Sequence, residues 1–179
     1  MSTTSTIVSN QNEELKKSLL NLIQSIQNDP DQAQAVFKAR STLKEGFQTE
    51  VNVRDFSFLS DEPEELGGTN LGPNPVEYVL GAFAACQEIV IKAYATVLGI
   101  EVESVRVDVE GDLDLHGFLN LTDERAGFTG VRYKTTIVSP ENDPEKLQTL
   151  EELSVRRCPV LDIIRNPVPL KGFVAFEKP

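Results

Sequence analysis

The chain of 179 residues contains no tryptophan, one methionine, one histidine and two cysteines. A single histidine, His116, excludes metal sites that need several imidazole ligands, and it excludes the H-E-x-x-H pattern of zinc proteases. Because His116 falls in an expected loop, we interpret it as a solvated turn residue rather than a catalytic base. The two cysteines lie too far apart for a C-x-x-C redox motif or a zinc knuckle. We therefore expect no metal and no cofactor.

Basic residues are also scarce, with 17 Lys and Arg against 28 Asp and Glu and a net charge of −11. Such a charge argues against binding to nucleic acids or anionic membranes, which attract clustered Lys and Arg. The most apolar segment has an uncharged run from Tyr78 to Gln87, which is too short to span a bilayer. The N-terminus has neither the basic region nor the apolar region of a signal peptide. We therefore expect a cytoplasmic protein with reduced thiols.

The clearest positive signal is the segment between Gly72 and Gly99. Asn74 is a strong N-cap residue, and Pro75 then falls at the first helical position, where its missing N–H is harmless. Glu77 follows three residues after Asn74, which is the spacing of a capping box. Gly99 suits the left-handed residue that closes a helix. These signals predict a helix over residues 76–98.

Apolar residues recur along this predicted helix at steps of three and four. They form one stripe, which predicts the core helix of the domain. Its members are Val79, Ala82, Phe83, Cys86, Ile89, Val90, Ala93 and Val97. A thiol, Cys86, therefore lies in the middle of the stripe.

The remaining periodicity predicts an α+β domain with mainly antiparallel strands. Residues 1–30 form an N-terminal extension with an amphipathic helix, and residues 31–179 form the main domain. The expected helices cover residues 12–27, 144–157 and 160–165 in addition to the long one. The expected strands cover residues 34–42, 47–59, 102–115, 128–139 and 168–176.

Cys158 has the stronger local case for a reactive thiol. It follows Arg156 and Arg157, and Pro159 after it suits the first position of a new helix. Nearby positive charge and a helix N-terminus both stabilise a thiolate, so we expect a lowered pKa for Cys158. The alternative interpretation is a small buried residue.

For Cys86 we expect the opposite change in the pKa of the thiol. Burial in the middle of a helix raises the pKa of a thiol unless a positive charge reaches it. Arg40 and Arg54, both in strand-like runs, are the candidate partners for a buried thiolate. The alternative is an exposed strand position or a surface ion pair for each arginine.

Two motifs carry a resemblance to a known family. The first is GPNPVEYVLGAFAAC, and the second is RRCPVLDIIRNPVP. Together they resemble the superfamily of osmotically inducible protein C and organic hydroperoxide resistance proteins (OsmC/Ohr), over roughly residues 35–178. The segment DEPEELGGTN is similar to one branch of that superfamily. The N-terminal helix lies outside the resemblance.

The resemblance implies an OsmC-like fold, in which antiparallel sheets wrap around long central helices in an intertwined homodimer with composite active sites. It implies reduction of organic hydroperoxides by Cys86, which becomes a sulfenic acid, with Cys158 as the resolving cysteine. A dithiol reductant would then restore both thiols. For the arginine that supports the peroxidatic thiolate, Arg54 is the best match and Arg40 is the alternative.

One position departs from the family pattern. Members with peroxidase activity carry a glutamate directly after the Asn-Pro, and Val76 occupies that position here. The carboxylate of Glu77 is one residue later, and one residue turns a side chain by ~100° around a helix. A second hypothesis is therefore a non-catalytic dimer that binds a small apolar or acyl ligand at the subunit interface. A third possibility is another thiol chemistry, such as detoxification of electrophiles.

Overall fold

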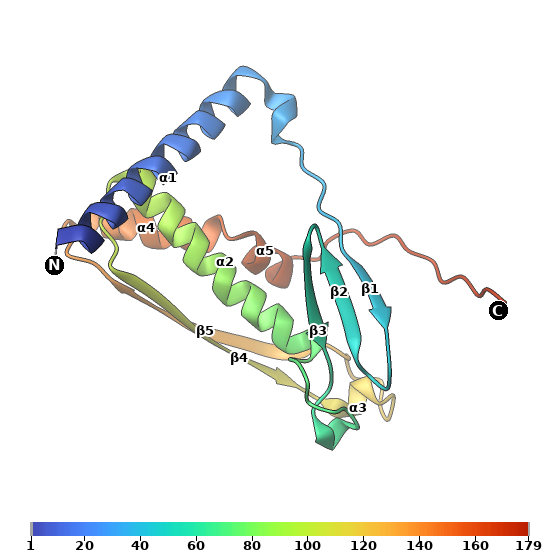
Figure 1. Cartoon of the computed structure of the whole chain (residues 1–179). Helices are drawn as coiled ribbons and strands as arrows, with labels where there is room; N and C mark the ends of the chain where they lie inside the picture. The colour runs from blue at the N-terminus through green and yellow to red at the C-terminus, as the bar shows by residue number, and fades with distance from the viewer. Residues whose placement is uncertain (1, 179) are drawn as a thin grey trace.

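The computed structural model describes the backbone of residues 2–178 and the side chains of residues 11–178. Figure 1 shows a long central helix, α2, with a two-stranded sheet along one side of it and a separate three-stranded sheet near its beginning. The helices are α1 (Ser2–Asn28), α2 (Pro75–Leu98), α3 (Leu115–Phe118), α4 (Pro144–Arg156) and α5 (Pro159–Arg165). The strands are β1 (Arg40–Leu43), β2 (Thr49–Val53), β3 (Phe56–Ser60), β4 (Ser104–Leu113) and β5 (Phe128–Val138). The molecule is therefore α+β with antiparallel sheets, as predicted.

Both ends of α2 follow the predicted signals. The side chain of Asn74 accepts the N–H of Glu77 at 2.9 Å, and the Glu77 carboxylate accepts the N–H of Asn74 at 2.8 Å. This reciprocal pair is the capping box that the spacing predicted. Gly99 closes the helix with a φ of 70°. The position of α2 along the chain is therefore fixed by local chemistry at each end.

The residues that α2 buries differ from the predicted stripe. The buried residues are Phe83, Gln87, Ile91 and Ala95, which follow one another at steps of four. Three members of the predicted stripe are exposed: Val79 by 42%, Ile89 by 69%, and Ala82. The prediction was wrong at these three positions because α2 has apolar residues on more than one face, and only one face packs within the described chain.

The core lies between α2, the β4–β5 sheet and the helices α4 and α5. Alternate residues of β4 and β5 point toward α2, while the others carry charge on the outer face. One cluster centres on Ile91 and Leu150, and a second contains Phe83 with Cys158 and Leu161. The ring of Phe83 meets the ring of Tyr133 edge to face at 4.9 Å.

The three-stranded sheet corrects the prediction of one long strand over residues 47–59. That run is itself a hairpin, because Arg54 adopts a φ of 54° between β2 and β3. The sheet carries large apolar side chains in contact with solvent: Leu43, Phe47, Phe56 and Phe58 are all exposed. Within the described chain, little of this sheet is covered.

The predicted strand over residues 168–176 is absent from the described structure. The segment is extended, leaves the body of the molecule and pairs with no strand of the same chain (Figure 1). Its apolar side chains are exposed: Val168, Leu170, Phe173, Val174 and Phe176. The sequence pattern is that of a strand, but a strand forms only where another strand supplies hydrogen bonds.

The N-terminal helix begins at Ser2 rather than at residue 12, and it packs near the end of α2 (Figure 1). Among the described residues, α2 is the one helix that is long and apolar enough to cross a membrane by length and composition. It is nevertheless the core helix of this fold, and it buries the polar Gln87 against α4. The proposed boundary between residues 30 and 31 stays a prediction.

Candidate dithiol site

The structure brings Cys86 and Cys158 together. The Sγ atom of Cys158 lies 3.3 Å from the Sγ atom of Cys86, and both cysteines are free thiols. The two residues come from different elements, the middle of α2 and the residue before α5. At this separation the thiol of Cys158 can donate its proton toward the sulfur of Cys86, and a small movement can join the sulfurs.

Each cysteine is held by its own element. Cys86 is one turn after the fully buried Phe83, so the packing of that ring fixes the turn that carries the thiol. Cys158 is the N-cap of α5, and its Sγ accepts the N–H of Leu161 at 3.5 Å. Pro159 occupies the first helical position, as the sequence predicted.

The predicted reactivity of Cys158 is wrong in direction. Burial raises the pKa of the Cys158 thiol, and the neighbouring sulfur of Cys86 raises it further, which outweighs the N–H of Leu161. The side chain of Cys158 is 1% exposed, whereas Arg156 and Arg157 are exposed to solvent, and neither forms a described hydrogen bond with the thiol. Cys158 is therefore a protonated thiol at neutral pH, and Cys86 is half-buried and more accessible.

Neither candidate arginine contacts the two sulfurs within its own chain. Arg40 lies on the exposed edge strand β1, opposite Asn52. Arg54 lies in the turn between β2 and β3, where its guanidinium stacks over the ring of Phe56 at 5.1 Å from the centroid. Among the hydrogen bonds of residues 11–178, none joins either arginine to Cys86 or Cys158.

Val76 and Glu77 both line a largely apolar cavity of about 510 Å³ at the beginning of α2. The carboxylate of Glu77 accepts the N–H of Asn74 in the helix cap, as the sequence predicted. Leu80, Leu113 and Phe128 also line this cavity.

Sequence reasoning missed the polar groups beside the thiols. Gln87 is buried next to Cys86, and its Nε2 donates to the carbonyl of Ser154 on α4 at 3.2 Å. This bond connects the two segments that carry the cysteines. The available signal was the spacing of Gln87, which lies four residues after Phe83 and four before Ile91 and therefore on the same face of the helix. The predicted stripe contained Cys86, one residue before Gln87, and left Gln87 out.

The chain was compared with known proteins. The sequence model of the family described as OsmC-like protein matches residues 68–171. A search of curated proteins finds no match. The crystal structure of an OsmC-like protein from Mycoplasma pneumoniae is 20% identical with a TM-score of 0.64, and the alignment covers 75% of this chain and 90% of that one.

Two further structures are described as organic hydroperoxide resistance proteins. The one from Legionella pneumophila is 25% identical with a TM-score of 0.54, over 73% of this chain and 90% of that one. The one from Elizabethkingia anophelis is 20% identical with a TM-score of 0.54, over 75% of this chain and 91% of that one. These likenesses agree with the fold described above.

Proposed function

Because the chain belongs to the OsmC-like protein family, we propose that it is a cytoplasmic thiol peroxidase that reduces organic hydroperoxides. The single observation that carries the proposal is the distance of 3.3 Å between the Sγ atoms of Cys86 and Cys158. A peroxidase that resolves its own sulfenic acid needs two thiols at such a distance. Two of the similar structures are described as organic hydroperoxide resistance proteins, which supports the substrate class.

In the proposed reaction, the thiolate of Cys86 attacks the distal oxygen of the hydroperoxide. The O–O bond breaks, Cys86 becomes a sulfenic acid, and the substrate leaves as an alcohol after it takes up a proton. The sulfur of Cys158 then attacks the sulfenic sulfur, which forms a disulfide and releases water. A dithiol reductant exchanges with the disulfide, restores both thiols and is itself oxidised.

The division of roles follows the burial of the two thiols. Cys158 is buried and protonated, so it suits the second step, in which it meets a sulfenic sulfur already beside it. Cys86 is half-buried, so it suits the first step, which requires access for the peroxide.

We also propose that the active site is completed by a second copy of the chain in a homodimer. Ile89 on α2, Phe56 on β3 and Phe173 near the C-terminus are exposed by 69%, 63% and 93%. Exposed apolar surface on this scale is characteristic of an interface. The arginine that stabilises the thiolate, Arg54 or Arg40, would then come from the other subunit, which agrees with the absence of such a contact within one chain.

Mass spectrometry of the intact protein tests the chemistry. One equivalent of cumene hydroperoxide should lower the mass of the reduced protein by about two units through a Cys86–Cys158 disulfide. Cys158→Ser should instead gain about 16 units as a sulfenic acid, which dimedone traps. Cys86→Ser should consume no peroxide with dithiothreitol as reductant. Peroxide consumption by Cys86→Ser at the parent rate would refute the proposal.

The cavity beside Val76 favours a second candidate function. An apolar cavity of about 510 Å³ at the position of the family glutamate suits a non-catalytic dimer that binds a small apolar or acyl ligand. This candidate expects an unchanged mass after mild peroxide treatment and a co-purified ligand in native mass spectrometry. The mass shift of about two units therefore separates the two functions.

A further inference from the structure

A single hydrogen bond from Gln87 joins the two segments that carry the thiols. The side chain of Gln87 is 1% exposed, and its Nε2 donates to the backbone carbonyl of Ser154 on α4 at 3.2 Å. Gln87 follows Cys86 directly on α2, and Ser154 precedes Cys158 by four residues. The bond therefore links, through a few residues on each side, two cysteines that lie 72 positions apart in the sequence.

The carbonyl of Ser154 has no partner inside its own helix. The last four carbonyls of an α-helix have no N–H group of a following turn to bind, and α4 ends two residues after Ser154. The N–H of Arg157 donates to the carbonyl of Leu153 instead. Among residues 11–178, the one donor to the Ser154 carbonyl is Gln87. Gln87 is therefore a cap for the C-terminal end of α4 that another helix supplies.

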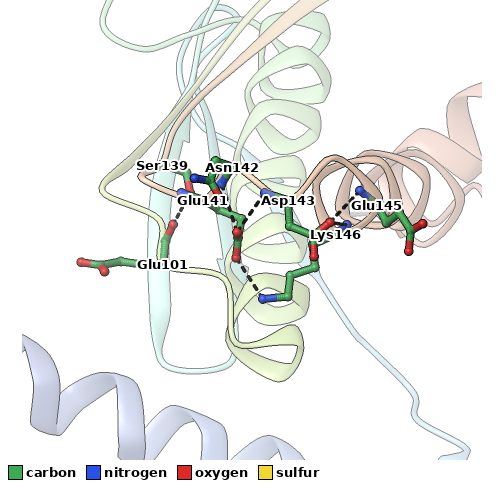
Figure 2. A network of polar contacts seen from close by, with 7 residues as sticks. All are labelled: Glu101, Ser139, Glu141, Asn142, Asp143, Glu145 and Lys146. Atoms are coloured by element: carbon green, nitrogen blue, oxygen red, sulfur yellow. Dashed lines mark hydrogen bonds and ion pairs between the residues drawn. The ribbon is translucent and has the colours of Figure 1, made fainter.

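The opposite end of α4 is held by its own turn, as Figure 2 shows. There Glu141 Oε1 accepts the N–H groups of the next two residues, and its Oε2 pairs with Lys146 at 3.1 Å. The thirteen residues of α4 place this turn about 20 Å from the end that leads to Cys158. Among the described polar contacts, the bond from Gln87 is the one that ties that end to α2.

The contact between the sulfurs depends on the position of that end of α4. Ser154 is 6% exposed, so its carbonyl would lose free energy if Gln87 did not bind it. The turn would then shift toward water or another donor, and it would carry Cys158 with it. A displacement of about 1 Å is enough to slow a reaction between two positioned groups. The Sγ atoms lie 3.3 Å apart while the bond is in place.

We propose that Gln87 is a positioning residue for disulfide formation, because its bond to Ser154 holds the sulfur of Cys158 beside Cys86. The inference rests on the proposed function, since it concerns the attack of Cys158 on the sulfenic acid of Cys86. In that step the S–S bond forms, the S–O bond breaks, and the leaving hydroxide takes the proton of the Cys158 thiol to become water. Gln87 gives no proton to this step and acts through geometry alone.

Rapid-quench mass spectrometry separates this step from the attack on peroxide. The rate of sulfenic acid formation rises with the concentration of cumene hydroperoxide, whereas the rate of disulfide formation reaches a plateau. Gln87→Leu, which removes the donor, should form the sulfenic acid at the parent rate, because Cys158 takes no part in that step. Its plateau rate should be about tenfold lower than that of the parent. A plateau at the parent rate would overturn the proposal.

Glu141→Ala is the control for a general loosening of α4. It removes the contacts that hold the distant end of the helix and leaves the bond of Gln87 in place. Its melting temperature should fall, as in Gln87→Leu, but it should form the disulfide at the parent rate. Equal slowing in both variants would mean that the rate follows the stability of α4, and the positioning role would be rejected.

Gln87→Glu offers a rescue that depends on pH. A protonated carboxyl can donate its O–H to the Ser154 carbonyl, whereas a carboxylate has no donor. Burial raises the pKa of a carboxyl. The titratable groups that line the same cavity between β5 and α4 are Tyr133, Glu141 and Glu151, and the two carboxylates raise this pKa further.

The rescue should therefore appear in acid. Disulfide formation by Gln87→Glu should approach the parent rate at about pH 5 and be about tenfold slower than the parent at about pH 8. The ratio of Gln87→Leu to the parent should not change with pH, because leucine has no proton to gain. A ratio for Gln87→Glu that is equally low at both pH values would show that the hydrogen bond does not control the step.

Diamide distinguishes a failure of this inference from a failure of the proposed function. It oxidises two neighbouring thiols to a disulfide without peroxide. A parent protein that does not react with hydroperoxide would refute the peroxidase, and diamide would still compare Gln87→Leu with the parent. Slower disulfide formation in Gln87→Leu would support the positioning role, and equal rates would overturn it. Circular dichroism checks each variant, and Gln87→Glu decides the question if Gln87→Leu does not fold.

Discussion

The backbone N–H of Leu161 donates to the Sγ atom of Cys158 at 3.5 Å, so a thiol fills the place of an N-cap oxygen at the beginning of α5. The same sulfur lies against Cys86. Cys158 therefore has two roles: it caps α5, and it belongs to the candidate site. Burial raises the pKa of its thiol, and the first prediction follows from that shift.

Cys86 should react with iodoacetamide before Cys158. Burial raises the pKa of Cys158, so its thiolate fraction at pH 7 is small and should grow only as the pH rises above the ordinary pKa of a thiol, ~8.5. Cys158 should be modified about tenfold more slowly than Cys86 at pH 7. Peptide mapping after timed alkylation measures both rates. A faster reaction at Cys158 would contradict the assignment of roles.

Arg54 should act on the cysteine of the other subunit. Arg54→Met and Cys86→Ser homodimers should each have little peroxidase activity. A heterodimer purified with two different affinity tags should recover about half of the parent activity, because it contains one complete site of two. An arginine that acted within its own chain would leave the heterodimer inactive. The same experiment with Arg40→Met decides between the two candidate arginines.

Glu77 should stabilise α2 without a part in peroxide reduction. Asn74→Ala should lower the free energy of unfolding by about 1 kcal/mol, because it removes the side chain that caps the helix. Glu77→Gln should lower it less and should leave the rate of disulfide formation unchanged. Urea unfolding and intact-mass kinetics measure the two effects. A large loss of rate in Glu77→Gln would show that this carboxylate replaces the family glutamate.

Asp61 should hold the loop that precedes α2. Its carboxylate accepts the N–H groups of Glu62, Thr69 and Leu71 and the hydroxyl of Thr69, and these bonds lower its pKa. Asp61→Asn should lower the melting temperature by about 5 °C or more at pH 7. Asp55→Asn, in the exposed turn after β2, is the control and should change it little.

The pH dependence of this effect has a definite sign. A carboxyl whose pKa is lower in the folded state stabilises the protein above its unfolded pKa of ~3.9, and it loses that contribution as the pH falls. The difference in melting temperature between the parent and Asp61→Asn should therefore be largest near neutral pH and shrink below pH ~4. A difference that grows in acid would contradict this account.

Phe83 should support both the core and the spacing of the thiols. Its ring is fully buried against Tyr133 and Cys158. Phe83→Ala should lower the free energy of unfolding by about 3–5 kcal/mol, as is typical when a buried aromatic residue is truncated. Phe83→Leu should cost less and should still slow disulfide formation, because the turn of α2 that carries Cys86 loses its support. An unchanged rate of disulfide formation in Phe83→Leu would show that Phe83 does not control the distance between the two sulfurs.

The elements that the sequence predicted well are those that local chemistry determines. The cap at Asn74, the closing Gly99 and the Pro residues at the beginnings of α4 and α5 act within a few residues of themselves. The family was predicted from two motifs and confirmed by the family model over residues 68–171, and the fold class was confirmed by the structure and its similar structures. The contact between Cys86 and Cys158 followed only from the resemblance, and their roles stay a prediction.

The predictions that were wrong have a different cause. Each depended on how another segment of the chain packs or pairs. The strand expected over residues 168–176 has no partner strand among the described residues. The pKa of Cys158 was expected to fall because its neighbours in sequence are arginines, but the fold buries the thiol and turns them to solvent.

The two fixed ends of α2 have a consequence for the dynamics of oxidation. A helix capped at Asn74 and closed at Gly99 has fixed ends, and the buried Phe83 anchors the turn before Cys86, so we expect Cys86 to keep its place. To reach the ~2.05 Å of a disulfide, we expect the movement to come from Cys158, which begins the seven-residue helix α5. Amide hydrogen exchange should therefore change on oxidation in α5 and leave the centre of α2 as slow as before.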